Sequence, residues 1–175
     1  MDRVPGRLSN LSAMAALRIC LTKHADGGAV LRCVRADGSV TWQRQRGRSA
    51  GFFPLHDLTH FAIESELGVR HAFYGLIADG WDIEETTGKS PRGPLPSEAY
   101  AVERLVGLFD LERAGSAVWS AHELNAHCYG PGAPLEQRLP RAITEDDLAR
   151  IRSRIDELLA RWAVLPGGET LELSF

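Results

Sequence analysis

The stretch of residues 52–64 constrains the fold more than any other part of this chain of 175 residues. It begins Phe-Phe-Pro and then predicts a helix, because proline is tolerated in a first turn and the residues that follow are apolar around most of the helix. At about 100° per residue, His56, His60 and Glu64 fall within an arc of about 80°, and Asp57 lies beside them. A helix this apolar has to lie in the core of a domain. Its stripe of imidazoles and carboxylates then needs a partner, because unpaired polar groups are costly to bury.

A divalent metal ion is the simplest partner for this stripe. Two histidines four residues apart on one helical face can each bring a ring nitrogen to the same ion. Asp57 is a candidate ligand or general base, and Glu64 is a candidate ligand, a general base or the group that orients His60. We therefore predict a site of His56, Asp57, His60 and Glu64, with zinc as the metal. The competing interpretation is that these are core or cap histidines satisfied by carboxylates and backbone groups.

Three other histidines are candidate ligands from neighbouring elements. His71 lies at the start of a short predicted helix, residues 71–78. His122 and His127 lie on another predicted helix, but about 140° apart, so they cannot share one ion from a regular helix. The Glu that follows His122 is accounted for by a capping box with Ser120 at the start of that helix.

The His56-Asp57-x-x-His60 segment is similar to that of the zinc-binding coenzyme Q biosynthesis family, and more distantly to the helix of zincin-type metalloproteases. The wider segment Phe-Pro-Leu-His-Asp-Leu-Thr-His also resembles uncharacterised bacterial proteins. The first resemblance implies a zinc site built from His56, Asp57 and His60. It does not indicate a substrate. That family places a glutamate further along the chain, at the position that Ala72 occupies here.

Composition favours one cytoplasmic domain. The length suits a single domain over residues 1–175. The net charge of −3 gives no reason to expect nucleic acid as a partner, and no segment approaches the ~20 apolar residues of a membrane span. Three widely spaced cysteines predict no disulfide framework, which fits a reducing compartment. Residues 1–16 have no secretory pattern and are a candidate disordered segment.

The periodicity predicts an α+β fold. Alternating apolar and polar residues predict a three-stranded antiparallel meander near the N-terminus and a last strand at the C-terminus that returns to it. The expected strands are residues 17–22, 30–35, 40–43 and 170–175. Four or five helices between them should cover this small sheet. Residues 81–97 lack periodicity and predict a long loop, which is either a lid over the site or a surface crossing.

These observations predict a cytoplasmic metal-binding protein. With an open coordination position, the metal would activate water, so a metal-dependent hydrolase is one hypothesis. The alternative is a non-catalytic binding or scaffold domain with a structural metal or no metal. The partner would be a small molecule or a peptide, and neither its identity nor the oligomeric state follows from the sequence.

Overall fold

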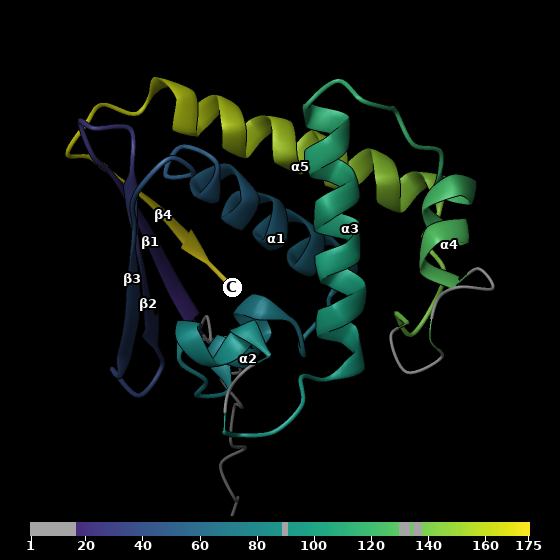
Figure 1. Ribbon diagram of the computed structural model, residues 1–175, viewed down its shortest axis with the longest axis horizontal. Helices are drawn as coiled ribbons and strands as arrows, with labels where there is room; N and C mark the ends of the chain where they lie inside the picture. Colours follow the sequence, from purple (N-terminus) through teal and green to yellow (C-terminus); the bar gives the residue numbers. More distant parts are fainter. Residues whose placement is uncertain (1–16, 89–90, 130–133, 135–137) are drawn as a thin grey trace, which may run out of the picture.

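The computed structural model describes residues 17–88, 91–129, 134 and 138–175. Residues 1–16, the candidate disordered segment, lie outside this description. The strands form one antiparallel sheet in the order β3-β2-β1-β4 (Figure 1). Their bounds are β1 Leu17–Lys23, β2 Ala29–Arg35, β3 Val40–Gln45 and β4 Thr170–Ser174. The predicted meander and the return of the C-terminal strand are therefore confirmed.

One face of the sheet forms part of the core. Leu17, Ile19 and Leu21 of β1 are buried on this face, as the period of two requires. The register pairs Ile19 with Cys33 of β2 and with Leu173 of β4, so the apolar residues of three strands lie side by side. Burying this face needs a second layer, which the helices provide.

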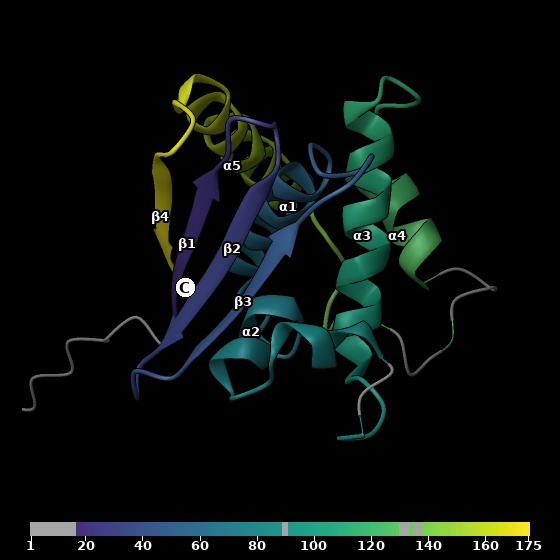
Figure 2. The same ribbon diagram turned by 60° about the vertical axis from the view of Figure 1, so that its left-hand side comes forward.

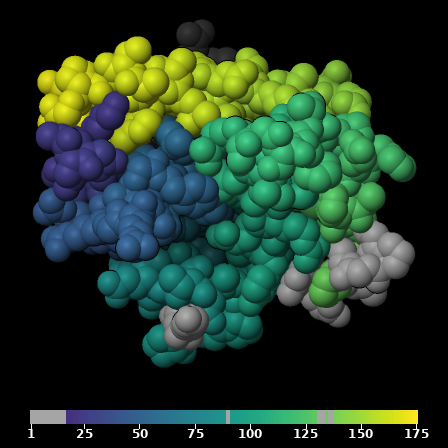
Figure 3. Space-filling view, turned by 45° about the horizontal axis from the view of Figure 1, so that its top comes forward, coloured from purple at the N-terminus to yellow at the C-terminus, as the bar shows by residue number. Residues whose placement is uncertain are grey.

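The helices lie on that face of the sheet, and α1 is the central one (Figures 1 and 2). Their bounds are α1 Phe53–Leu67, α2 Phe73–Ala78, the 3-10 helix η1 Ile83–Thr87, α3 Ser97–Arg113, α4 Ala121–Tyr129 and α5 Glu145–Val164. The predicted α+β class is confirmed. α5 extends across the molecule beside α3 (Figure 3). No helix in the described part of the chain is both long and apolar enough to cross a bilayer.

The sequence accounts for both ends of α1. Pro54 stands in the first turn, where a helix loses nothing by lacking an N–H. The helix ends at Gly68, whose φ of 67° lies in the left-handed region that favours glycine. Between these ends the apolar residues contact the sheet, α3 and α5, so α1 lies in the core as its composition predicts.

Residues 81–97 are not a plain loop. Within the described part of this segment the chain forms η1, which packs against α2 and β3. The N–H of Ile83 donates to the hydroxyl of Thr41 on β3 at 3.1 Å. Arg35 of β2 donates to the carbonyl of Trp81 at 2.5 Å. These bonds attach the segment to the edge of the sheet.

The first turn of α5 holds a buried carboxylate. Asp147 accepts hydrogen bonds from the backbone and hydroxyl of Thr144, at 2.9 and 2.8 Å, in a capping box. It also pairs with Arg141 at 2.5 Å and with Arg150 at 2.6 Å. The hydrogen bond from Arg141, helped by those from Thr144 and Arg150, lowers the pKa of Asp147 far below its ordinary value.

Replacing Asp147 by asparagine should lower the free energy of unfolding at pH 7 by about 1–3 kcal/mol, because the charge-assisted bonds to Arg141 and Arg150 are lost. A depressed pKa stabilises the fold above the unfolded-state pKa near 4, and this stabilisation is lost as pH falls through the folded-state value. Urea unfolding at pH 7 and pH 3 should therefore show a smaller difference between variant and parent at pH 3. The exposed neighbour Asp146, replaced by asparagine, is the control and should change little. An equal loss in both variants would contradict the role of Asp147.

Candidate metal centre

Two imidazoles of α1 lie together on the side of that helix that faces α3. The rings of His56 and His60 have centroids 4.9 Å apart and stand edge to face. The His60 side chain is buried, whereas that of His56 is 24% exposed. The spacing of four residues along α1 brings them together, as the sequence predicts.

A carboxylate from α3 completes the group. Glu103 places Oε1 3.3 Å from Nε2 of His60 and is 50% exposed. One donor atom from each of His56, His60 and Glu103 lies within 4.8 Å of the other two, so the three could hold a metal ion. Because two of the donors are partly exposed, an ion there can be reached from solvent.

A second pair of carboxylates lies on the Nδ1 side of the two rings. Oδ2 of Asp110, also on α3, is 2.8 Å from Nδ1 of His56. Oε1 of Glu64 is 3.3 Å from Nδ1 of His60. A carboxylate at Nδ1 favours a proton there, and metal-binding histidines make such a contact at the ring nitrogen that does not bind the ion.

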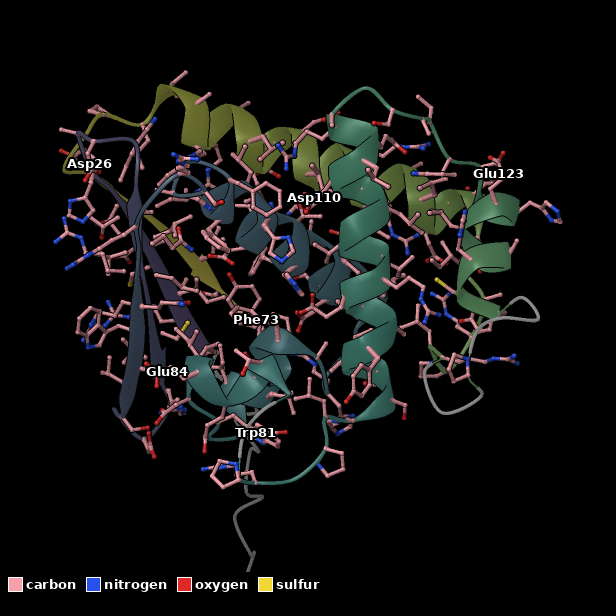
Figure 4. The ribbon with its side chains drawn as sticks, viewed as in Figure 1. Asp26, Phe73, Trp81, Glu84, Asp110 and Glu123 are labelled. Carbon is pink, nitrogen blue, oxygen red and sulfur yellow. The ribbon has the colours of Figure 1, made fainter. Side chains whose placement is uncertain are left out.

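Asp110 is itself held by a cation. Burial raises its pKa, but the hydrogen bonds from His56 and Arg113 outweigh burial and leave the pKa below its ordinary value. The Arg113 guanidinium donates to Oδ1 of Asp110 at 2.9 Å. Asp110 therefore stays ionised and fixed in place beside His56. Figure 4 shows it on the side of α3 that faces α1.

Glu64 has a second role as the cap of α2. It is fully buried, and its Oε2 accepts the backbone N–H of Tyr74 at 2.9 Å and of Gly75 at 3.2 Å. These amides belong to the first turn of α2, whose unpaired N–H groups attract a carboxylate. Burial raises the pKa of Glu64, and His60 and the two amides work against that shift. The Glu64 carboxylate thus contacts both α2 and His60, so the position of α2 and the orientation of the His60 ring depend on the same side chain.

The surroundings of His60 favour a positive charge. Burial by itself would lower the pKa of His60, but the hydrogen bonds to Glu103 and Glu64 outweigh it and raise the pKa to about 10. The hydrogen bond from His60 in turn lowers the pKa of Glu103, despite the burial of that carboxylate. A cation is therefore stabilised between the two carboxylates, whether it is a proton on His60 or a metal ion beside it.

The structure does not bring Asp57 into this group. One residue after His56, its side chain turns toward β3, where it accepts a hydrogen bond from the amide of Gln45. It is buried there, and burial raises its pKa to about 6 against the opposing effects of His60, His56 and Gln45. Of the four predicted residues, His56 and His60 are among the three that could hold an ion, Glu64 lies behind His60, and Asp57 faces the sheet.

The other three candidate histidines lie elsewhere. His71 is exposed and pairs with Glu98 at 3.2 Å. His127 is exposed and packs its ring against Trp119, and His122 is exposed on α4. The predicted capping box at the start of α4 is present, since the N–H of Ser120 donates to Glu123 at 2.8 Å. Within the described part of the chain, none of the three histidines joins the group at His60.

Sequence reasoning missed Glu103 and Asp110. One signal for them was available, because residues seven apart lie on the same face of a helix and both are acidic. They also border the apolar face that packs α3 into the core, through Val102, Val106 and Phe109. What the spacing does not show is that this border meets the histidine side of α1.

α1 has Pro54 in its first turn and ends at Gly68, and it packs against α3. These features account for how the two helices bring the group together. Comparisons of the chain with protein families, with curated proteins and with solved structures found no match.

Proposed function

We propose that this protein binds one divalent metal ion, zinc, through His56, His60 and Glu103. The observation that carries the proposal is the convergence of these three donors within 4.8 Å from two helices. Two imidazole nitrogens and one carboxylate oxygen form a ligand set that zinc uses. The carboxylates of Glu64 and Asp110 support it, because each contacts Nδ1 of one of the two rings and so fixes the orientation of that ring.

We further propose that the site is catalytic and hydrolytic. Structural zinc sites are closed by four protein ligands, whereas catalytic sites have three and keep an open position for water. The partial exposure of His56 and Glu103 lets water reach that position. A zinc ion bound there would lower the pKa of its water to about 7 and so supply a nucleophile. Asp110 and Glu64 would orient the imidazoles and retain their Nδ1 protons.

One observation favours a different role for the same residues. His60 already contacts two carboxylates, with Nδ1 3.3 Å from Glu64 and Nε2 3.3 Å from Glu103. A protonated His60 would then link α1 to α3 without any metal, as part of a non-catalytic domain. The two functions differ in whether zinc binds.

Zinc binding can be measured by elemental analysis of protein purified without chelator and by competition with a chromophoric chelator. We expect one equivalent of zinc per chain. Replacing His56 by alanine or Glu103 by glutamine should weaken binding more than 100-fold, because losing a residue that only orients a ligand already costs about 10–100-fold. His71→Ala is the matched control, since it removes an exposed imidazole that pairs with a glutamate, and its affinity should equal that of the parent.

Two results would contradict the proposal. If the parent protein takes up no zinc, manganese or iron, the metal site is excluded and the alternative remains, in which a protonated His60 links α1 to α3. Undiminished zinc binding by both the His56 and the Glu103 variants would place the metal elsewhere in the chain.

A further inference from the structure

Aromatic rings line the site on both sides of the two histidines. The ring of Phe52 lies 5.3 Å from that of His56, tilted by 34°. The ring of Phe73 lies 5.2 Å from that of His60, and Figure 4 shows Phe73 on the side of α2 that faces the same region as Asp110. Phe53 meets Phe52 edge to face at 6.0 Å. We name Phe52, Phe53 and Phe73 the aromatic rim.

Two members of the aromatic rim offer apolar surface to solvent. Phe52 is 42% exposed and Phe53 is 40% exposed. A single exposed apolar side chain needs no explanation, because much of any protein surface is apolar. Two adjacent exposed phenylalanines, one of them against a partly exposed imidazole of the candidate metal site, form a local surface that a ligand can cover.

The ring of Phe52 is held in place. The guanidinium of Arg113 lies over its ring, 5.6 Å from the centroid, and also donates to Asp110 at 2.9 Å. Asp110 in turn contacts His56. Phe52 is therefore held in place by its contacts with Arg113 and His56, and a ligand that packs against its exposed surface does not have to order it first.

Metal-binding residues beside exposed aromatic side chains favour a ligand that has a metal-binding group and an apolar group. Small-molecule sites have mostly apolar and aromatic linings with a few polar groups that fix orientation. Here the polar groups are His56, His60 and Glu103, and the apolar part is the aromatic rim. If an ion were held by these three residues, it could bind an oxygen donor of the ligand at a coordination position that they leave open.

Resting on the proposed zinc site, we propose that its ligand is a small molecule with a planar aromatic ring attached to a metal-binding acyl group. The acyl oxygen would bind the metal, and the ring would pack against the exposed surfaces of Phe52 and Phe53. The substrate class of the proposed hydrolase is then an aromatic acyl compound, an ester or an amide.

Two hydroxamates that bind zinc through the same oxygens test this proposal. Benzohydroxamate carries the ring and acetohydroxamate carries a methyl group in its place. On zinc-loaded protein, calorimetry should show tighter binding of benzohydroxamate by roughly 10-fold or more, as contact between aromatic rings and burial of the ligand's ring predict. Because the two hydroxamates also differ in their intrinsic affinity for zinc, the measured quantity is the ratio of their dissociation constants in each variant.

In Phe52→Ala the preference for benzohydroxamate should fall at least about 5-fold, and in Phe53→Ala it should fall less. Phe52→Leu keeps an apolar side chain in contact with His56 and gives the same answer if the alanine variant does not fold. Trp42→Ala is the matched control, because Trp42 is an exposed aromatic residue, 63% exposed, on β3. The ratio of the two dissociation constants in Trp42→Ala should equal that of the parent.

The outcomes separate this inference from the zinc site itself. Zinc-loaded protein whose hydroxamate ratio is the same in the parent and in both Phe52 variants overturns the aromatic ligand and leaves the metal site in place. Zinc-loaded protein that binds neither hydroxamate has no open position, which also overturns it. If the protein binds no zinc, the elemental analysis already contradicts the proposed metal site, before any hydroxamate is tested.

Discussion

Replacing Gly75 by alanine is expected to lower the free energy of unfolding by about 3 kcal/mol or more. A Cβ at this position would stand 2.0 Å from the carbonyl oxygen of Arg70 and 2.4 Å from its carbon. These are backbone atoms, so the overlap can be relieved only by moving α2 or the chain before it, and packing errors of this kind are among the costliest substitutions. The N–H of Gly75 also donates to Glu64, so a displaced α2 should disturb the carboxylate that holds His60.

The measurement is urea unfolding, with Gly107→Ala as the matched control. Gly107 lies inside α3, and a Cβ there would meet nothing within 4 Å. The same change should therefore raise the free energy of unfolding by about 0.5–1 kcal/mol, because alanine has a higher helix propensity and less freedom in the unfolded chain. Equal effects at the two glycines would show that α2 does not need its close approach to Arg70.

Replacing Glu64 by alanine should destabilise the fold by about 3–5 kcal/mol. The change removes one partner of a buried charged pair, and it leaves the amides of Tyr74 and Gly75 without an acceptor. Glu66, two residues further along the same helix, makes a partly exposed ion pair with Arg150 at 3.4 Å. Glu66→Ala is the control and should cost no more than about 1 kcal/mol.

Glu64→Gln separates the two roles of this residue. Its amide oxygen can still accept from the N–H groups of α2, which leaves the amide NH2 facing Nδ1 of His60. That donor favours the tautomer with its proton on Nε2, the nitrogen nearest Glu103. Stability should then fall less than in Glu64→Ala, while zinc affinity should fall about 10–100-fold. Unchanged zinc affinity in a folded Glu64→Gln protein would mean that Glu64 only caps α2.

Several elements were predictable because their causes are local. The start of α1 at a proline and its end at Gly68, the capping box of Ser120 and Glu123, and the alternation in β1 all depend on residues within a few positions of one another. The α+β class followed from the same patterns, because alternating segments at both ends of the chain pair most simply as strands of one antiparallel sheet. The histidine pair was predictable for the same reason, since both members belong to one helix.

The segment around 81–97 was less predictable. It contains no apolar periodicity, and its order comes from bonds to distant residues such as Arg35 and Thr41. Nothing within a few residues of Trp81 indicates those partners. Its description as one long loop therefore missed η1.

The sequence by itself determined that α1 is a core helix and that His56 and His60 share one of its sides. Only the tertiary structure decided that Glu103 and Asp110 of α3 meet that side, and Asp110 lies 54 positions after His56 along the chain. It also turned Asp57 toward Gln45 and made Glu64 the cap of α2. The physical reason is that helical spacing fixes which residues share a face, whereas the packing of the whole core fixes which helix that face meets and at what rotation.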